Sequence, residues 1–144
     1  MRGRAVVDTN ILVYISNQSS PFHLKALNAF VEIRNHYELW ISRQVLREFA
    51  VVVSRPDFAE HPADSDSLIS ALTKWSKIFL VADETDAVTQ KLIQLISDYN
   101  IKGKRIHDAN IVATMMTNKI ANILTMNAAD FNGFNEISVM SLAL

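Results

Sequence analysis

The chain has 144 residues, of which 49% are hydrophobic and 20% charged, and its formal net charge is −1. This balance fits one folded domain and excludes a disordered chain, a membrane-spanning chain and a protein that grips nucleic acid by overall positive charge. The chain has no cysteine, which excludes disulfide scaffolds and thiolate metal sites. No secretory signal precedes the first apolar run, so we expect a cytoplasmic protein.

Short apolar runs alternate with amphipathic segments along the chain. The runs predict strands at residues 5–7, 39–41, 78–81, 120–124 and 137–139. Helical periodicity and capping residues predict a first helical turn at 11–14 and helices at 22–37, 43–54, 85–99 and 107–116. A further helix, capped by Asp64, is expected to include residues 68–75. The alternation predicts a single α/β domain over residues 1–144 with a mainly parallel sheet. Ligands of such sheets bind beyond the carboxyl ends of the strands, near a switch in strand order.

Two details of the helices can be read from the residues. In the helix expected at 22–37, Leu24, Leu27, Phe30, Val31 and, less regularly, Ile33 recur near helical spacing, so we expect an amphipathic helix that buries this face. In the segment 68–75, Leu68, Ile69, Leu72 and Trp75 are expected to share one face. Polar residues immediately before two helices, Ser42 and Asp64, are plausible N-caps.

Four acidic residues fall where this architecture predicts a shared cleft. Asp8 follows the first strand and Asp130 the fourth, whereas Glu48 and Asp108 lie on helices that enter from strand ends. Each has an ordinary reading as a helix cap, a turn residue, a solvent-facing residue or a partner of the helix dipole. Together, four carboxylates at one edge would repel one another unless a cation neutralises them. Oxygen ligands without cysteine suit Mg²⁺ or Mn²⁺, as in metal-dependent phosphodiester hydrolases.

Four blocks of the sequence resemble the motifs of PIN-domain proteins, in the order that the family has them. The blocks are residues 6–14, 42–49, 107–115 and 123–131, and each contains one of the four acids. A lone domain of this size is similar to the VapC-type ribonuclease toxins of type II toxin–antitoxin systems. The resemblance implies a three-layer α/β/α sandwich of RNase H-like type. It also implies an Mg²⁺- or Mn²⁺-dependent endoribonuclease that cleaves RNA phosphodiester bonds by metal-activated water.

The resemblance assigns catalytic and metal-binding roles to Asp8, Glu48 and Asp108. Many family members have a fourth aspartate two residues after the threonine that corresponds to Thr125, and here that residue is Asn127. Asp130 is the nearest acid and is our candidate for the fourth catalytic and metal-binding position. The expected supporting polar residues are Thr9, Asn10, Thr125 and Asn127. The alternative is a catalytically weak or degenerate PIN domain that binds RNA or protein, which Asn127 keeps open.

Substrate and partners are predicted less directly. Five basic residues near the acids are candidates for RNA phosphate contacts, with a solvated surface as the alternative reading: Arg43, Arg47, Lys102, Lys104 and Arg105. The family resemblance implies a homodimer and an antitoxin partner whose flexible basic segment covers the acids.

Two other classes of protein, an enzyme and a binding module, fit the sequence poorly. An aspartyl phosphotransferase would have a second aspartate at the position of Asn10, and a receiver-like module would have two adjacent acids after an early strand.

Overall fold

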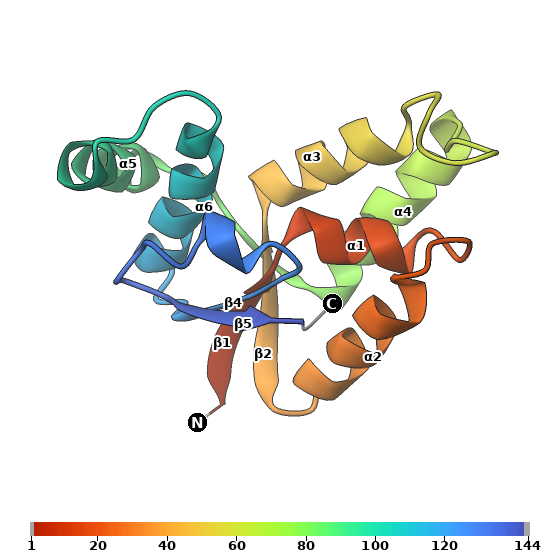
Figure 1. Cartoon of the computed structure of the whole chain (residues 1–144), viewed down its shortest axis with the longest axis horizontal. Coiled ribbons are helices and arrows are strands. Elements are labelled where there is room, and N and C mark those ends of the chain that lie inside the picture. The colour runs from red at the N-terminus through yellow and green to blue at the C-terminus, as the bar shows by residue number, and fades with distance from the viewer. Residues whose placement is uncertain (1, 143–144) are drawn as a thin grey trace.

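A computed structural model describes residues 2–142, which form six α-helices, one short 3₁₀ helix and five strands (Figure 1). The strands are β1 (Gly3–Val7), β2 (Tyr37–Ser42), β3 (Leu80–Ala82), β4 (Asn122–Thr125) and β5 (Ser138–Ser141). The α-helices are α1 (Thr9–Ile15), α2 (His23–Ile33), α3 (Arg43–Val53), α4 (Ser65–Ile78), α5 (Asp86–Tyr99) and α6 (Arg105–Thr117). The 3₁₀ helix η1 (Ala128–Asp130) lies between β4 and β5.

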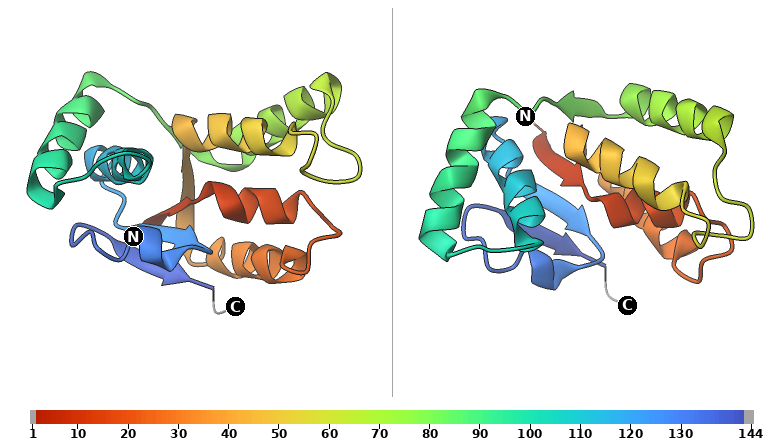
Figure 2. Two further views of the ribbon diagram at one scale, coloured as in Figure 1. Left: turned by 45° about the horizontal axis from the view of Figure 1, so that its top comes forward. Right: turned by 90° about the horizontal axis from the view of Figure 1, so that it is seen from above.

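All five described strands run parallel, in the order β3-β2-β1-β4-β5. Parallel strands are joined by right-handed crossovers, so the connections that lead from β1 to β2 to β3 place α1 to α4 on one face. The connection from β3 to β4 runs back across the sheet in the opposite direction. Its helices, α5 and α6, therefore cover the other face (Figure 2). The predicted sandwich of helices around a parallel sheet is confirmed.

The strand order switches direction between β1 and β4, which lie side by side at the centre of the sheet. Val7 pairs with Leu124, and the next backbone N–H, that of Asp8, donates to the carbonyl of Leu124 at 3.0 Å. Ala5, Val6 and Val7 are fully buried, as expected of a central parallel strand covered on both faces. The crevice beyond this pair of strands is therefore the place where the fold favours a ligand site.

Several predicted boundaries are wrong by two to four residues. The helix predicted at 22–37 ends at Ile33, because residues 34–36 form a turn and Tyr37 already begins β2. The third strand was expected at 78–81, but Ile78 still belongs to α4 and the strand occupies Leu80–Ala82. Because residues 78–81 are all apolar, the sequence pattern does not show where α4 ends and β3 begins. The fourth and fifth strands likewise begin after the predicted positions, at Asn122 and Ser138.

The apolar faces of two helices also differ from prediction. On α2 the buried residues are Ala26, Phe30 and Ile33, whereas Leu24 is 67% exposed and Val31 47% exposed. On α4, Trp75 is buried but Ile69 is 64% exposed. Both N-caps are confirmed, since Ser42 Oγ accepts from the Val45 N–H and Asp64 Oδ1 from the Ser67 N–H. Within residues 2–142 we find no helix with the length and apolar character needed to cross a bilayer.

Candidate functional site

Asp8 is the central residue of the candidate site, because it sits at the point where β1 ends beside β4. It is only 7% exposed and caps the start of α1, where its Oδ1 accepts from the Thr9 N–H at 2.8 Å. Its Oδ2 accepts from Thr125 Oγ1 at 2.8 Å and from Asn10 Nδ2 at 3.3 Å. The cap reading of Asp8 is thus correct, and the same side chain lies where the strand order switches. Each carboxylate oxygen has a fixed partner, so the orientation of the group is set.

Glu48 reaches the same region from α3, one of the helices on the face covered by α1 to α4. Thr9 Oγ1 donates to Glu48 Oε2 at 3.2 Å, which places the Glu48 carboxylate beside the first turn of α1. Gln44, one turn earlier on α3, donates from Nε2 to Glu48 Oε1 at 2.6 Å. The solvent-facing reading of Glu48 does not hold, because the side chain is half-buried and held at both oxygens.

Asp108 lies in the first turn of α6 and Asp130 on η1. The charges of both are close enough to repel other acids of the group. Burial raises the pKa of Asp108 to about 6, with further increases from the charges of Asp130, Asp8 and Glu48 against a lowering by Arg105. Burial also raises the pKa of Asp8 to about 6, opposed by hydrogen bonds from Thr125 and the Thr9 N–H and assisted by repulsion from Glu48 and Asp130. The fold thus brings all four predicted acids into one electrostatic group.

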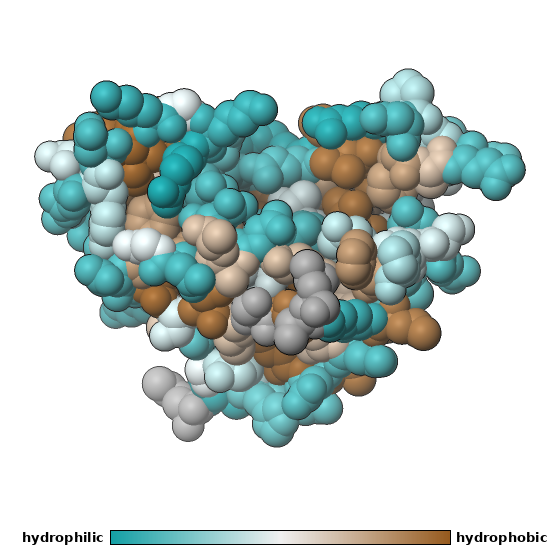
Figure 3. All heavy atoms as spheres, viewed as in Figure 1, coloured by the Kyte–Doolittle hydropathy of each residue, from teal (hydrophilic) through white to brown (hydrophobic). Residues whose placement is uncertain are grey.

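We call the region around these four acids, between α6 and α3, the acidic cleft. In the space-filling view a notch separates the side that carries α6 from the side that carries α3, with mainly hydrophilic residues on the first side and both hydrophilic and hydrophobic residues on the second (Figure 3). None of the three ion pairs found in residues 2–142 involves Asp8, Glu48, Asp108 or Asp130. A group of like charges without neutralising partners, one of them buried, favours binding of a cation.

The donor chemistry of the acidic cleft fits a hard divalent cation. Between residues 2 and 142 there is no group of three or more Asp, Glu, His or Cys side chains that could hold one metal ion. The side chains as they stand therefore offer fewer than three such ligands to a single ion. Mg²⁺ is commonly bound in this way, by one or two carboxylates with waters and substrate phosphate completing its shell.

Three of the four predicted supporting residues contact the acids. Thr9 and Thr125 donate to Glu48 and Asp8, and Asn10 connects Asp8 to β4 by donating to Thr125 and accepting from the Met126 N–H at 3.1 Å. The fourth, Asn127, contributes its backbone, whose N–H donates to Thr125 Oγ1 at 3.0 Å. Its side chain is exposed. Thr125, which is fully buried, therefore supports Asp8 and is itself fixed by its neighbours.

The five predicted RNA-binding residues divide into two groups. Arg43 is ion-paired with Asp83 at 2.7 Å and Arg47 with Glu84 at 3.0 Å, so acids on the loop before α5 already neutralise them. Lys102, Lys104 and Arg105 are exposed at the start of α6. Arg105 is near enough to lower the pKa of Asp108, and its guanidinium lies 5.5 Å from the centre of the Phe134 ring. The second group remains the better candidate for phosphate contacts beside the acidic cleft.

Sequence reasoning missed two residues that organise the cleft, Gln44 and Asn110. Gln44 is 5% exposed and donates from Nε2 to the carbonyl of His107 at 2.9 Å as well as to Glu48. Its Oε1 accepts from Asn110 Nδ2 at 2.8 Å. Gln44 thus links the helix that carries Glu48 to the helix that carries Asp108. A polar residue one turn before Glu48 and facing the same way was the available signal.

Comparison with known proteins concerns the family and the fold. The family model described as PIN domain matches residues 5–136. No curated protein matches the sequence. The fold is similar to that of VapBC2 from Rickettsia felis, solved bound to a DNA fragment from its promoter, with a TM-score of 0.74 and 18% identity. That match covers 97% of this chain and 99% of the other.

Two other solved structures share the fold at similarly low identity. DNA-bound VapBC from Salmonella typhimurium has a TM-score of 0.69 and 14% identity, over 99% of this chain and 100% of that one. VapC20 from Mycobacterium tuberculosis, a toxin that cleaves the sarcin–ricin loop, has a TM-score of 0.63 and 17% identity, over 83% and 86%. At such identities the likeness establishes the shared fold.

Proposed function

The chain belongs to the PIN domain family, and we propose that it is an Mg²⁺- or Mn²⁺-dependent endoribonuclease acting as the toxin of a toxin–antitoxin pair. The observation that carries the proposal is the convergence of Asp8, Glu48, Asp108 and Asp130 at the switch in strand order. These acids have no basic ion-pair partner among the described residues. Carboxylates held close together without a neutralising partner lower the stability of the fold, and binding of a cation would explain why they are kept there.

The proposed site divides the work between Asp8 and Asp108 on the one hand and Glu48 on the other. Asp8 and Asp108 would hold the more tightly bound ion, and Glu48 would bind through water or bridge to a second ion. When bound, the metal supplies a Lewis acid that lowers the pKa of an attacking water and offsets charge on the scissile phosphate. The chain itself fixes the angle of the Asp8 carboxylate through Thr125 and the Thr9 N–H, and that of Glu48 through Gln44.

The toxin assignment rests on the fold and on the chemistry of the cleft. Several similar solved structures are toxin–antitoxin complexes, including those from Rickettsia felis and Salmonella typhimurium. We propose a partner whose flexible segment inserts an arginine or lysine among the four acids. A guanidinium can bind two carboxylate oxygens at once and would replace the metal's charge. We also propose a homodimer, as the family resemblance implies.

A cleavage assay tests the proposed activity. Purified protein should cut RNA with Mg²⁺ or Mn²⁺ and stop when a chelator removes the metal. Asp108→Asn should abolish cleavage while circular dichroism shows that the fold is kept. Asp57→Asn, the same substitution in an exposed loop, should cut RNA at the wild-type rate. Cleavage in chelator, or full activity of Asp108→Asn, would disprove the mechanism. RNA or partner binding without any cleavage would instead favour the degenerate PIN domain.

A further inference from the structure

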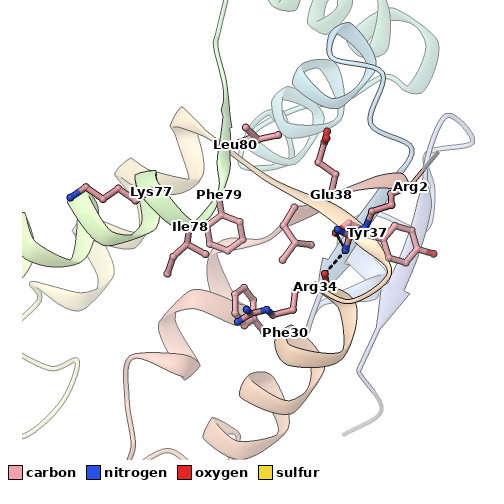
Figure 4. A pocket seen from close by; sticks show the side chains of 10 residues that line it. Arg2, Phe30, Arg34, Tyr37, Glu38, Lys77, Ile78, Phe79 and Leu80 are labelled. Atoms are coloured by element: carbon pink, nitrogen blue, oxygen red, sulfur yellow. Dashed lines mark hydrogen bonds between the residues drawn. The ribbon is translucent and has the colours of Figure 1, made fainter.

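The end of the sheet opposite the acidic cleft collects basic residues. Two hollows open there, at the amino ends of β1 and β2. The first, of about 470 Å³, has Arg2, Arg34 and Lys77 among its lining residues (Figure 4). The second, of about 520 Å³, has Arg2, Arg4 and Lys119. Because Arg2 and Glu38 line both, the hollows form one continuous surface, which we call the basic edge.

Most of the charge on the basic edge is available to a ligand. Glu38, the one acid that lines either hollow, is paired with Arg4 at 3.1 Å and accepts from the Trp40 indole N–H at 2.8 Å. Arg2 donates to the backbone carbonyls of Arg34 and Tyr37, which carry no formal charge. Among residues 2–142, no ion pair involves Arg2, Arg34, Lys77 or Lys119, and all four are exposed.

The floor of the first hollow is apolar and aromatic rather than polar. Phe30 and Phe79 pack edge to face beneath it, with ring centres 5.7 Å apart. Tyr37 is half-buried beside Arg2, while Ile78 and Leu80 on the rim are 49% and 48% exposed. Basic side chains around a surface that can contact a ring are typical of sites that hold a single strand of nucleic acid.

We propose that the basic edge binds the phosphodiester backbone of the substrate RNA at a distance from the point of cleavage. The choice of RNA rests on the proposed function. The acidic cleft repels phosphate, and both arginines of α3 beside it are already paired with acids. Lys102, Lys104 and Arg105 at the start of α6 can add phosphate contacts close to the cleft. Arg2, Arg34, Lys77 and Lys119 offer a second group of exposed cations, none of them in an ion pair within residues 2–142, at the far end of the sheet.

The separation of the two sites sets a minimum length of RNA. A strand of five residues, such as β1, spans roughly 16 Å. At about 3.4 Å per nucleotide, a stacked strand needs at least about five nucleotides to cover that depth. An RNA of about four nucleotides can thus occupy the acidic cleft without touching the basic edge, whereas one of about thirty can contact both.

Binding in chelator, measured by fluorescence anisotropy, tests the proposal independently of cleavage. The double variant Arg34→Ala/Lys77→Ala removes two exposed cations from the first hollow and should weaken binding of the long RNA about tenfold. The slope of log affinity against log salt should fall by about 1.4, since each contact to a single strand contributes about 0.7. The four-nucleotide RNA serves as the cleavage control: with Mg²⁺ the double variant should cut it at the wild-type rate, because it can occupy the acidic cleft without touching the basic edge. The matched control Lys25→Ala/Lys91→Ala loses the same charge away from both hollows.

Three results would overturn the proposal. The double variant could bind long RNA as the control variant does, or its affinity for long RNA could fall with no change in the salt slope. A glutamate-rich peptide could instead bind the wild type and lose affinity in the double variant while RNA binding is unchanged, which would assign the surface to an acidic protein. Failure of the proposed function has a different signature, because it would abolish metal-dependent cleavage and leave these binding measurements intact.

Discussion

The two ends of the sheet carry opposite charge in different ways. At the carboxyl end, Asp8 is buried and each of its oxygens has a fixed hydrogen-bond partner. At the amino end, Arg34 and Lys77 are exposed and lack a charged partner among the described residues. Buried groups with fixed partners define geometry, whereas exposed charges supply attraction that salt screens. Single changes should therefore have large effects at the acidic cleft and small, cumulative effects at the basic edge.

The largest effect is expected for Asp8→Asn. The substitution preserves the shape of the side chain but removes the charge at the centre of the cleft. Residues that only orient a metal ligand contribute up to about a hundredfold to activity. Loss of a ligand itself should therefore lower the rate of metal-dependent cleavage by at least about a hundredfold. Arg34→Ala at the basic edge should raise KM a few-fold and leave kcat unchanged. Single-turnover and steady-state cleavage of one RNA by both variants measure the contrast. Equal losses in kcat would contradict the division of roles.

Gln44→Leu should have the next largest effect, because Gln44 connects Glu48 to α6. The variant leaves the Asn110 amide and the His107 carbonyl without their partner, which costs about 1–3 kcal/mol of unfolding free energy. We expect the metal concentration at half-maximal rate to rise about tenfold, as for other residues that orient metal ligands. Gln90→Leu, an exposed change on α5, is the control. A destabilised variant with unchanged metal dependence would show that Gln44 only stabilises the fold.

The contrast between Asp8 and Gln44 shows what the sequence could predict. Asp8 follows a short buried run, and parallel strands bring their carboxyl ends to one edge, so local pattern and fold class together place it. The contacts of Gln44 join residues 63 and 66 positions apart, and they depend on how closely α3 approaches α6. Nothing in the spacing of a single helix contains that information.

The basic edge and the strand boundaries escaped prediction for related reasons. Arg2, Arg34, Lys77 and Lys119 come from four separate segments, and only the packing of the ends of α2, α4 and α6 around the amino ends of the strands brings them together. The start of β3 was misplaced because apolar residues continue from the end of α4 into the strand. Periodicity cannot separate two buried elements that adjoin without a polar break.

Removal of one charge from the acidic cleft should stabilise the metal-free protein. Asp108→Asn relieves repulsion from Asp130, Asp8 and Glu48. Because Asp108 is only partly buried, we expect a gain on the order of 1–2 kcal/mol in unfolding free energy, or a few degrees in melting temperature in chelator at neutral pH. Added Mg²⁺ should stabilise the wild type much more than the variant. If Asp108 only served the helix terminus, asparagine would leave the melting temperature nearly unchanged or lower it.

The pH dependence of the same protein follows from the raised pKa values. Asp8 and Asp108 have a pKa of about 6 when folded, against 3.8 as the ordinary value. Between these values the folded protein binds more protons than the unfolded one, so its stability falls as the pH rises from about 4 through about 6. Thermal melts in chelator should show this slope for the wild type and a shallower slope for Asp108→Asn. A slope of the opposite sign would mean that these acids are not held together in the fold.

The smallest effect is expected at the fourth acidic position, where Asp130 and Asn127 both lie on the exposed rim. Asp130 repels Asp8 and Asp108 without a hydrogen bond to either, so it acts on a bound cation mainly through its charge. An exposed charge contributes up to about 1 kcal/mol, so Asp130→Asn should raise the metal concentration at half-maximal rate about two- to fivefold. Asn127→Asp should lower it by a similar factor, because the new carboxylate would follow Thr125 at the rim. Metal titrations of the cleavage rate measure both changes, with Asp57→Asn as the control for loss of an exposed acid. Unchanged titrations in both variants would show that neither residue acts on the ion and that Asp8, Glu48 and Asp108 form the whole site.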